Sequence, residues 1–573
     1  MIRLTINGVE IEVPEGTTIL QAALKANIHI PTLCYLPEVQ AIGACRVCLV
    51  EVEGIANLQA SCVFPASNGL KVHTNTDKVR KARQFAVEML LSNHPMDCLT
   101  CHRNLNCELQ KIAHELGITE IHFQGTKSKG GIDDSSPSIR RDNSKCILCR
   151  RCVSVCGNIQ SVNALALQGR GFETRVEPAF LNGLAEVACT NCGQCTLVCP
   201  VGALTEKDDT QEVWNAISDP SKFVIIQDAP AVRAALGEEF GYPPGTLVTG
   251  KMLAAARKLG FDRVFDTNFA ADLTIIEEGS ELLKRVHEGG TLPLITSCSP
   301  GWIKFIEHFY PELLPHLSTC KSPHQMLGAL CKTYFAEKEG INPKDMVVVS
   351  VMPCTAKKFE CTRPEMTDSG YKDVDYVLTT REFARMIKEA GIDFCNLEDE
   401  TYDNPMGEYT GAATIFGATG GVMEAALRTA YEIATGKSLE NLDFIAVRGL
   451  EGIKEAAVKV DGIGDVKVAV AHGLGNARKL MEKIKHNDAD YHFIEIMACP
   501  GGCVGGGGQP IPVNYETRTL RAKALYNEDK SLKYRKSHEN PSIKKIYEEY
   551  LLKPLGEKSH HLLHTSYTPR SVF

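Results

Sequence analysis

The first 76 residues alternate apolar and polar side chains, as the strands of a half-buried sheet do. Two such runs, Ile2–Ile6 and Val9–Val13, are separated by an Asn-Gly dipeptide, which favours a tight hairpin turn. The apolar positions from Ile19 to Ala26 follow two threonines and have the period of a short capped helix. Residues 1–76 are therefore predicted to form a small α+β domain of the β-grasp kind.

Helical and strand-like periods also organise the rest of the chain. A helical pattern runs from Asp77 to Leu91, and residues 125–140 are polar and rich in Gly and Ser, which is typical of a linker. From residue 210 onward, strand-like runs alternate with helical patterns. A parallel α/β sheet is expected there, with its functional site at the carboxyl ends of the strands. The strand-like runs are Phe223–Ile226, Leu292–Ile295, Val347–Val351, Val466–Ala471 and Phe493–Ile496.

These changes of pattern predict a multidomain protein with both α+β and α/β parts. The predicted tail contains three histidines and is expected to be a solvated extension or a docking segment. The predicted division is residues 1–76, residues 77–124, a linker at 125–140, residues 141–209, a large α/β domain at 210–555 and the tail at 556–573.

Composition narrows the classes of function. The net charge of −8 and pI near 6.1 argue against a nucleic-acid or anionic-membrane partner. The first residues contain no apolar segment of a signal peptide, and no apolar run reaches the roughly 20 residues that cross a membrane. A cytoplasmic protein that binds neither membrane nor nucleic acid is expected.

The 23 cysteines change the picture most. A disulfide scaffold is the alternative to metal binding, but disulfide scaffolds are typical of short exported chains. In a long chain without an export signal, clustered C-x-x-C spacings favour metal ligation. The sequence therefore predicts several metal centres.

The first cluster of cysteines falls within the predicted N-terminal domain and has the spacing C-x10-C-x2-C-x13-C. This spacing differs from the plant-type ferredoxin pattern. It resembles the 2Fe-2S domain shared by hydrogenases and a large subunit of respiratory complex I, and a tetrahedral zinc site is the alternative. The ligands would be Cys34, Cys45, Cys48 and Cys62.

The second cluster is His94-x3-Cys98-x2-Cys101-x5-Cys107. Three thiolates and one imidazole can close either a 4Fe-4S cubane or a zinc site, and spacing alone leaves these nearly balanced. The same motif follows the 2Fe-2S domain in the family that the first cluster resembles. That context favours the cubane.

The next two clusters repeat the spacing of bacterial two-cluster ferredoxins, and the second repeat ends in Cys-Pro. In this pattern the fourth cysteine of each run ligates the other cubane. Four accessory clusters in a row would conduct electrons between a surface partner and a buried site. One cubane would be held by Cys146, Cys149, Cys152 and Cys199, and the other by Cys156, Cys189, Cys192 and Cys195.

Three strand-like runs of the α/β part lead within a few residues to a cysteine. These are Cys298, Cys354 and Cys499, and Cys503 follows four residues after the last. Because the carboxyl ends of parallel strands share one edge of a sheet, these thiolates are expected to converge. Free buried cysteines are the alternative.

Three long motifs contain these cysteines. The chain is similar to FeFe-hydrogenases in all three, with one departure in the first, where the family has T-S-C-C-P-x-W. With the accessory clusters, the resemblance covers almost the whole chain and implies reversible hydrogen oxidation. The motifs are Thr296-Ser-Cys-Ser-Pro-Gly-Trp302, Met352-Pro-Cys-Thr-Ala-Lys-Lys-Phe-Glu360 and Glu495-Ile-Met-Ala-Cys-Pro-Gly-Gly-Cys-Val-Gly-Gly-Gly-Gly-Gln-Pro510.

The resemblance implies an H-cluster, in which a 4Fe-4S cubane is joined by a cysteine thiolate to a diiron unit with CO, cyanide and a bridging dithiolate. Cys354, Cys499 and Cys503 would ligate the cubane, Cys503 would bridge to the diiron unit, and Lys357 would donate a hydrogen bond to a cyanide. The resemblance also implies apolar side chains that pack against the diiron unit. For the methionines among them, ordinary packing in the protein core is the alternative to this role. These side chains, the expected apolar wall, are Ala229, Pro230, Met352, Phe416 and Met497.

The resemblance also implies a proton relay that ends at Cys298. Two of its members, Glu278 and Glu281, are three residues apart on a helical pattern and so share a face. An exposed acidic helix face is the alternative. The remaining members would be Arg285 and Ser318.

The departure from the family motif is Ser299, which stands where the family has a cubane ligand. Either Ser299 ligates iron through oxygen and Cys298 carries the proton, or Cys298 is the ligand and Ser299 handles the proton. Thiolate is the usual ligand of iron–sulfur clusters, whereas family position favours Ser299. Both interpretations stay open.

The chain lacks a dinucleotide-binding glycine motif after a strand and a flavin motif, so it is not expected to bind NAD itself. The order of domains and Ser299 resemble the hydrogenase subunit of multimeric NAD(P)-linked, electron-bifurcating complexes, with flavin and iron–sulfur subunits as partners. A ferredoxin-dependent enzyme is the alternative. A hydrogen-sensing or electron-transfer iron–sulfur protein without turnover is the alternative from a different class, and a complex-I-like structural subunit is excluded by the motifs after residue 296. Cysteines without cluster spacing, expected to be buried thiols, are Cys320, Cys331, Cys361 and Cys395.

Overall fold

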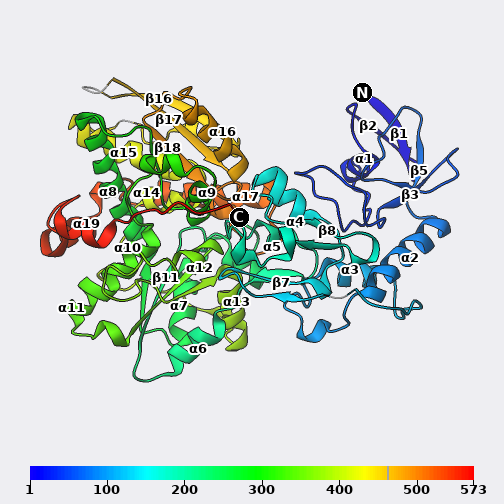
Figure 1. The fold of residues 1–573 in the computed structure, drawn as a ribbon, viewed down its shortest axis with the longest axis horizontal. Coiled ribbons are helices and arrows are strands. Elements are labelled where there is room, and N and C mark those ends of the chain that lie inside the picture. Colours follow the sequence, from blue (N-terminus) through cyan, green and yellow to red (C-terminus); the bar gives the residue numbers. More distant parts are fainter. Residues whose placement is uncertain (129, 440, 461–463, 573) are drawn as a thin grey trace.

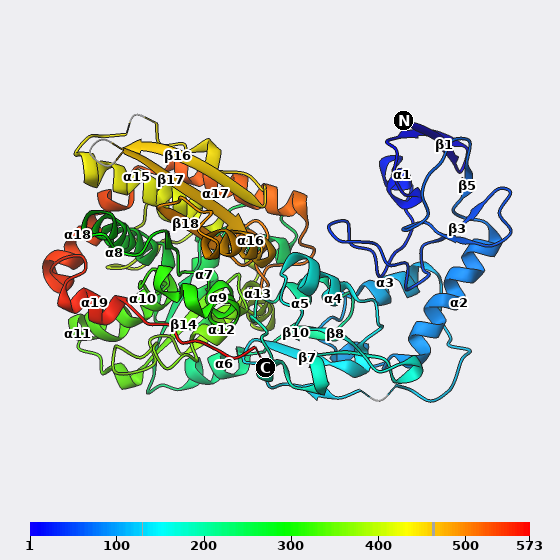
Figure 2. The same ribbon diagram turned by 45° about the horizontal axis from the view of Figure 1, so that its top comes forward.

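The computed structural model describes residues 1–128, 130–439, 441–460 and 464–572. The N-terminal domain, in blue, lies farthest from the catalytic part, which runs from green to red, and the cyan segments lie between them (Figure 1). The turned view shows the same arrangement (Figure 2). The cysteine-rich domains therefore form an arm that leads towards the α/β part.

The N-terminal domain is a five-stranded sheet of order β2-β1-β5-β3-β4 covered by one helix. Its hairpin turns through Asn7 and Gly8, which both have positive φ (51° and 83°) as a type I′ turn requires. The helix begins at Thr18, whose side chain accepts a hydrogen bond from the backbone N–H of Gln21. The predicted hairpin and helix are confirmed. The elements are β1 (Ile2–Ile6), β2 (Val9–Val13), α1 (Ile19–Lys25), β3 (Leu49–Val52), β4 (Gln59–Ala60) and β5 (Lys71–His73).

Two helices and a small antiparallel sheet of order β10-β7-β6 follow. The segment predicted as a linker is wrong in part, because it contributes β6 and the start of β7 to this sheet. Its polar residues are held by hydrogen bonds: the Ser136 hydroxyl donates to Asn191 at 3.1 Å, and Asp133 accepts from the backbone of Leu184. The elements are α2 (Asp77–Asn93), α3 (Glu108–Glu115), β6 (Ile132–Asp133), β7 (Ile139–Asp142), α4 (Arg151–Ser154), β8 (Ala166–Gln168), β9 (Arg175–Glu177), α5 (Gln194–Val198) and β10 (Leu204–Glu206).

The α/β part contains two four-stranded sheets rather than one. The first, β12-β11-β14-β15, is entirely parallel, and the second, β13-β18-β17-β16, ends in an antiparallel strand that the sequence analysis missed. β13 is shorter than predicted because Pro293 has no N–H for pairing. The strands are β11 (Phe223–Asp228), β12 (Arg263–Asp266), β13 (Leu294–Ile295), β14 (Met346–Met352), β15 (Tyr376–Thr379), β16 (Ile453–Val460), β17 (Gly464–His472) and β18 (Phe493–Met497).

Helices pack around both sheets, and the longest, α8, contacts α10 and α15. It begins after Asp266, whose side chain accepts from the backbone N–H of Asn268. In the described ranges, no helix is long and apolar enough to cross a membrane. The helices are α6 (Thr210–Ser218), α7 (Thr249–Leu259), α8 (Thr267–Glu288), α9 (Pro300–Phe309), α10 (Pro323–Leu330), α11 (Ala336–Glu339), α12 (Ala356–Glu360), α13 (Thr380–Glu389), α14 (Gly411–Thr414), α15 (Gly421–Thr435), α16 (Leu474–Lys485), α17 (Tyr515–Ser531), α18 (Pro541–Ile546) and α19 (Glu557–Leu563).

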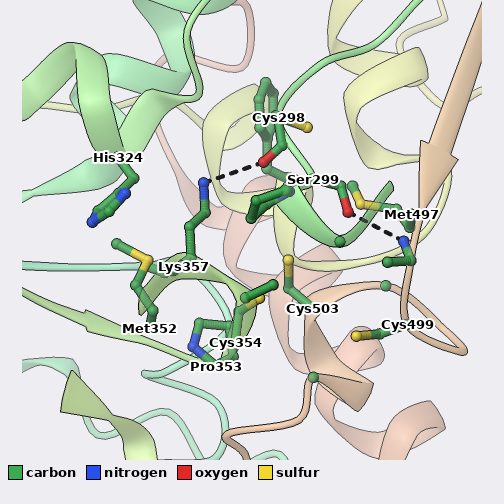
Figure 3. A pocket seen from close by; sticks show the side chains of 18 of the residues that line it. Cys298, Ser299, His324, Met352, Pro353, Cys354, Lys357, Met497, Cys499 and Cys503 are labelled. Carbon is green, nitrogen blue, oxygen red and sulfur yellow. Dashed lines mark hydrogen bonds between the residues drawn. The ribbon is translucent and has the colours of Figure 1, made fainter. Parts of the chain in front are cut away.

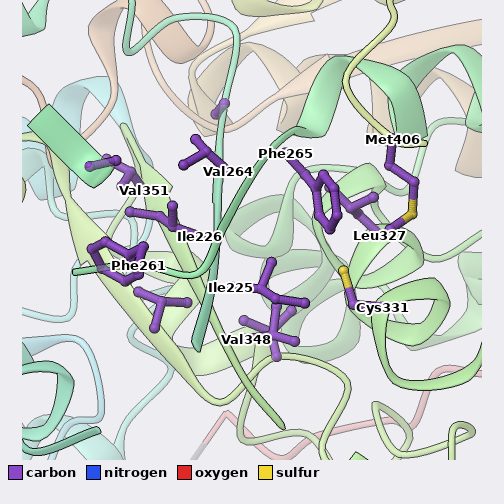
Figure 4. Packing of buried hydrophobic residues seen from close by; sticks show 14 of the residues in the cluster. Ile225, Ile226, Phe261, Val264, Phe265, Leu327, Cys331, Val348, Val351 and Met406 are labelled. Atoms are coloured by element: carbon purple, nitrogen blue, oxygen red, sulfur yellow. The ribbon is translucent and has the colours of Figure 1, made fainter. Parts of the chain in front are cut away.

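The core of the first sheet is built from aliphatic strands and aromatic residues of their neighbours (Figure 4). Ile225 and Val348 are fully buried on adjacent strands, and Phe265 packs edge-on against Phe335. Fully burying such a side chain stabilises the fold by about 1.5–3 kcal/mol. A rigid sheet of this kind fixes the loops that leave its carboxyl ends.

The predicted solvated tail is wrong. α19 carries buried Leu562 and Leu563 between polar residues, so one face of this helix packs against the protein. Residues 563–572, here called the strap, then run along the segment that contains Cys320 (Figure 1). The backbone N–H of Lys321 donates to Leu563 at 2.8 Å, and that of Thr565 donates to Thr319 at 2.7 Å.

Candidate active site and cluster-binding sites

A cavity lies where strands of both sheets end. Cys298 follows β13, Cys354 follows β14, and Cys499 follows β18, so the expected convergence of these cysteines occurs, although the strands belong to two sheets. Cys503 comes from the next turn and lines the same cavity (Figure 3). Within the described residues, these four cysteines of the α/β part thus contribute to the wall of one cavity.

Three of these thiols crowd one another away from solvent. Burial raises the pKa of Cys503 to about 12, and the neighbouring Cys354 raises it further. Burial likewise raises the pKa of Cys499 well above its ordinary value, with Cys354 and Cys192 adding to the effect. Crowded buried thiols of this kind become thiolates when a metal centre balances their charge. The donor set therefore fits a cubane with an attached diiron unit.

The glycine run after Cys503 lets backbone segments meet at the wall of the cavity. A Cβ atom at Gly506 would lie 2.0 Å from the carbonyl oxygen of Pro353, and one at Gly507 would lie 2.5 Å from that of Cys192. Side chains at these positions would push apart the loops that carry the cysteines. The glycines are therefore required for close approach.

The rest of the cavity wall is mainly apolar, as the resemblance implied. Met352 and Met497 are the last residues of β14 and β18, and Phe416 lies before α15. A dry wall excludes water from a bound metal centre and strengthens electrostatic interactions inside it. The structure brings together all five expected wall residues: Ala229, Pro230, Met352, Phe416 and Met497.

Lys357 is the cation at this wall. Its ammonium group donates to Glu360 at 2.8 Å and to the carbonyl oxygen of Cys298 at 3.2 Å. Although burial opposes it, Lys357 and His324 hold the pKa of Glu360 at about 2. Lys357 is thus oriented by an ionised carboxylate and can donate a further hydrogen bond into the cavity.

His324 is a cavity residue that the sequence analysis missed. Its ring lies between Glu360, 3.0 Å from Nδ1, and Ser350, 2.7 Å from Nε2. Burial lowers the pKa of His324 to about 4, which leaves the imidazole neutral near pH 7. The sequence carried no spacing signal for it, because its partners come from other elements.

Cys298 and Ser299 point in different directions. The sulfur of Cys298 points away from the other three labelled cysteines in Figure 3 and packs in the apolar cluster with Phe416. Ser299 turns instead towards β18, and its hydroxyl oxygen accepts a hydrogen bond from the backbone N–H of Ala498 at 3.2 Å. Burial raises the pKa of Cys298 well above its ordinary value, and the charge of Glu278 adds to this effect.

The residues of the expected proton relay lie together on and beside α8. Glu281 accepts hydrogen bonds from Arg285 at 2.5 Å and from the hydroxyl of Ser318 at 3.2 Å. Burial raises the pKa of Glu278 to about 8, with the nearby charge of Glu281 contributing. Glu278 is 2% exposed and Glu281 8% exposed, so an exposed acidic helix face is excluded.

The four cysteines of the N-terminal domain also converge. The thiol of Cys34 interacts by hydrogen bonding with those of Cys45 and Cys62, and Cys48 interacts with Cys62. Three of the four are buried and the fourth, Cys45, is half-buried. Four contacting thiols on loops of a small sheet fit a 2Fe-2S cluster.

His94 ends α2 and is 9% exposed. Its Nδ1 atom is buried and makes no hydrogen bond within the part of the chain that the structure describes. A buried ring nitrogen without a partner is costly unless it binds a metal or water, so this atom fits a ligand role. Cys98, Cys101 and Cys107 follow on the next short turns and remain half-buried.

The two-cluster ferredoxin domain contains two separate cavities, each lined by four cysteines. The sets are those that the crossed spacing predicted. Cys192 lines the second cavity and also the catalytic cavity, so one residue joins the two sites. The first cavity is lined by Cys146, Cys149, Cys152 and Cys199, and the second by Cys156, Cys189, Cys192 and Cys195.

Residues of both N-terminal ligand sets lie near the first ferredoxin cavity. The thiol of Cys107 donates to the carbonyl oxygen of Pro200, next to Cys199, at 3.7 Å. Glu108, the next residue, forms an ion pair with Arg151; burial lowers the pKa of this guanidinium and the ion pair raises it. The thiols of Cys149 and Cys34 both raise this pKa further, so both sites lie close to one guanidinium.

Among the cysteines without cluster spacing, the predictions are confirmed for three and wrong for one. Cys320, Cys331 and Cys361 are buried. Cys395 is exposed, in a short turn after α13. Its apolar neighbours in the sequence bury their own side chains without covering the thiol.

Fold and site together define an iron–sulfur redox protein whose electron-conducting sites lead to one buried catalytic cavity. Comparison with protein-family models shows which kind of iron–sulfur redox protein this is. Residues 222–507 match the iron-only hydrogenase large subunit, C-terminal domain, and residues 515–570 match the iron hydrogenase small subunit. The accessory parts match a 2Fe-2S cluster-binding domain (1–77), the NADH-ubiquinone oxidoreductase-G iron–sulfur binding region (83–122) and a 4Fe-4S dicluster domain (145–203).

Individual relatives agree with these matches. The chain is 53% identical to the NADP-reducing hydrogenase subunit HndD of Solidesulfovibrio fructosivorans, over all of this chain and 99% of the relative. It is 44% identical to iron hydrogenase 1 of Clostridium pasteurianum, over 98% of this chain and 99% of the relative. An FeFe-hydrogenase structure from Chlamydomonas reinhardtii covers 64% of this chain and 100% of its own, with 46% identity and a TM-score of 0.57.

The chain therefore belongs to the iron-only, or FeFe, hydrogenase family, and the resemblance seen in the sequence is confirmed. Members of this family are enzymes that interconvert molecular hydrogen with protons and electrons. The chain carries domains for 2Fe-2S and 4Fe-4S clusters in addition to the catalytic domain of the family. The match of residues 515–570 to a small-subunit family was not predicted, because the helical periods of this segment do not distinguish it from the end of the catalytic domain.

Proposed function

We propose that this chain is the hydrogen-converting subunit of a hetero-oligomeric, pyridine-nucleotide-linked hydrogenase. The observation that carries this proposal is Cys192, which lines both a cluster cavity and the catalytic cavity. Electrons from the catalytic centre would leave through this wall and reach the N-terminal domains, which extend away from the catalytic part (Figure 1). The relative named as an NADP-reducing hydrogenase subunit supports flavin- and NAD(P)-binding partner subunits, with ferredoxin as a second electron carrier in a bifurcating complex.

The test is isolation of the native complex followed by identification of its other chains. Flavin- and NAD(P)-binding subunits are expected to co-purify, and hydrogen should reduce a pyridine nucleotide in the complex. The isolated, matured chain should evolve hydrogen from reduced viologen. A native preparation that turns over hydrogen but contains no co-purifying chain would contradict the proposed complex, and absence of turnover in the matured chain would favour a sensor.

The chain's own residues would supply binding, orientation and proton transfer. When bound, the H-cluster supplies the cleavage and formation of the hydrogen–hydrogen bond. Cys354, Cys499 and Cys503 would hold it, and Lys357 would donate a hydrogen bond to an anionic ligand at the apolar wall. The methionines and Phe416 keep water away from the cavity.

Protons would move between Cys298 and the surface through Glu278, Ser318 and Glu281, with Arg285 at the outer end. The raised pKa of Glu278, about 8, suits a carboxyl group that must both hold and release a proton near neutral pH. Ser318 would pass the proton between the two glutamates through its hydroxyl. In this order, Cys298 interacts electrostatically with Glu278, and Glu278 interacts by hydrogen bonding with Ser318.

Ser299 would occupy the fourth ligand position of the cubane through its oxygen, leaving Cys298 as the relay thiol. The support is geometric: the sulfur of Cys298 points away from the other three cysteines (Figure 3). The N–H of Ala498 hydrogen-bonds the Ser299 oxygen and would stabilise negative charge on it. A serine ligand binds iron less readily than a thiolate, so this cubane would be less tightly held than an all-cysteine one.

Metal analysis tests the ligand sets. The matured protein should contain about 18 iron atoms in one 2Fe-2S cluster and four cubanes, and two more in the diiron unit. Iron, zinc and acid-labile sulfide should be measured after anaerobic purification. One zinc per chain with iron four atoms short would show that the site of His94 binds zinc instead.

Replacing His94 by Cys should retain the cluster but lower its reduction potential, because a charged ligand replaces a neutral one. Electron flow to the partner subunits should slow, whereas viologen activity should persist as an internal control. Potentiometric EPR and partner-linked assays measure the two effects. Unchanged partner-linked activity would place this cluster away from the main electron route.

A further inference from the structure

Glu281 has hydrogen-bond partners on both carboxylate oxygens. Oε1 accepts from Arg285, which also donates to the carbonyl oxygens of Thr291 and Leu317. A guanidinium stays charged at any pH that a protein tolerates, so Arg285 can balance the charge of Glu281 but cannot take up and release its proton. A proton that reaches Glu281 therefore needs another acceptor.

The second oxygen leads to such an acceptor. Oε2 of Glu281 interacts with the hydroxyl of Thr319 at 3.1 Å, and the same hydroxyl lies 2.8 Å from Nδ1 of His564. Imidazole is the side chain that gains and loses a proton near neutral pH. Through one hydroxyl, Glu281 is thus connected to a group suited to accept its proton.

Glu277 orients the imidazole of His564. One oxygen of Glu277 lies 3.2 Å from Nε2 of the ring and accepts from the backbone N–H of Leu555 at 2.8 Å, while the other accepts from the Tyr547 hydroxyl at 2.5 Å. A carboxylate at Nε2 favours the tautomer with hydrogen on that atom. The lone pair of Nδ1 then faces Thr319, an arrangement like that of a hydroxyl, an imidazole and a carboxylate in a hydrolase triad.

The strap holds His564 in this place. The residue is 4% exposed and pairs with Cys320 as an isolated bridge. Its ring stacks on that of His560, with centroids 4.6 Å apart and planes within 9°. His560 is exposed, so His564 lies one side chain away from solvent.

We propose that His564 is a further proton-accepting residue of the hydrogenase reaction, reached from Glu281 through Thr319. In hydrogen oxidation, the O–H bond of protonated Glu281 breaks as its proton passes to Thr319 Oγ1, and the Thr319 hydroxyl proton forms an N–H bond at Nδ1. Glu281 is left as a carboxylate paired with Arg285, and the carboxylate of Glu277 balances the imidazolium. Hydrogen evolution reverses these transfers. The inference rests on the proposed relay through Glu281.

Several titratable groups surround His564. Two carboxylates from α8, Glu277 and Glu281, face it, and the other titratable neighbours are Cys320, Tyr547 and His560. Lys284 of α8 acts electrostatically on His560, on the outer side. The same Glu281, Cys320 and His564 are close enough to share a cation, but burial raises the pKa of Cys320 well above its ordinary value, which disfavours the thiolate that a metal needs.

The test compares His564→Gln and Thr319→Val with wild type in the matured, full-length enzyme. The readout is formation of HD from D2 in water, which reports proton exchange at the active site without an electron acceptor. Both variants should lose roughly tenfold in rate, because His564→Gln removes the proton acceptor and Thr319→Val removes the hydroxyl that connects it to Glu281. EPR and infrared signatures of the clusters should stay unchanged.

Three controls separate this role from a structural one. His561→Gln, an exposed histidine of the same helix, should behave as wild type, and Thr319→Ser should retain the activity because it keeps the hydroxyl. If Thr319→Val and His564→Gln both keep the wild-type rate while Glu281→Gln is inactive, the proposed transfer from Glu281 to His564 is wrong, and the relay through Glu281 still holds. A fully active Glu281→Gln variant would contradict both the relay through Glu281 and the transfer from Glu281 to His564. If His564→Gln does not fold, the rate of HD formation in the Thr319→Val variant alone tests the proposal.

Discussion

Replacing Glu281 by Gln should lower hydrogen turnover by at least about 100-fold, because an amide cannot carry the proton that the carboxyl group passes on. The change is nearly isosteric, and the amide oxygen can still accept a hydrogen bond from Arg285. The hydroxyls of Ser318 and Thr319 can turn to accept from the new amide N–H group, whereas the backbone N–H of Thr319, which donates to the other carboxylate oxygen of Glu281 at 3.0 Å, loses its acceptor. Turnover should therefore fall without loss of the fold or of the bound clusters.

Viologen-dependent evolution and oxidation of hydrogen should both be measured, together with the infrared bands of the diiron unit. Glu288→Gln is a matched control, because Glu288 is an exposed glutamate at the end of the same helix. Wild-type activity in Glu281→Gln would mean that protons reach the cavity by another route. Loss of the diiron bands would indicate a structural role instead.

Replacing Cys298 by Ala should lower turnover by at least about 1,000-fold while the cubane remains intact. The sulfur of Cys298 lies on the side of the apolar cluster with Phe416 and close to Glu278, not among the other three cysteines. Removing it should interrupt proton transfer between the cavity and Glu278. The ligands of the cubane should be unaffected.

Substitutions at Ser299 complete this experiment. Ser299→Cys should make the cubane more resistant to chelators, because a thiolate replaces an oxygen ligand, and Ser299→Ala should make it less resistant. EPR of the cubane in chain produced without the diiron unit measures both effects. Loss of the cubane in Cys298→Ala, with an intact cubane in Ser299→Ala, would assign the ligand role to Cys298.

Much of the site was predictable because its residues lie close together in the sequence. The crossed ligand sets of the ferredoxin domain follow from spacing, and the structure brings Cys199 to the first cavity and Cys156 to the second. Glu278 and Glu281 share a helix face for the same reason. Local periodicity likewise placed the ends of the strands that it predicted to within two residues.

The features that escaped prediction depend on contacts between distant segments. His324 is identified by Glu360 and Ser350, which belong to other elements, and His564 by residues far before it in the chain. β16 was missed because Lys454 is buried and Ala457 is exposed, which blurs the alternation of apolar and polar residues, and the strap because three histidines look solvated in isolation. Whether such side chains are buried is decided by packing, which no local pattern records.

The strap also has a consequence for biosynthesis. Thr319 and His564 are separated by 245 positions, so a ribosome that has just released Thr319 must translate all of the intervening chain before the two can meet. At about 5–20 residues per second, this takes on the order of 10–50 s. Until then, the strap does not cover Glu281 and Thr319. The first sheet of the catalytic half, whose last strand β15 ends at Thr379, can thus form well before the proton acceptors are assembled.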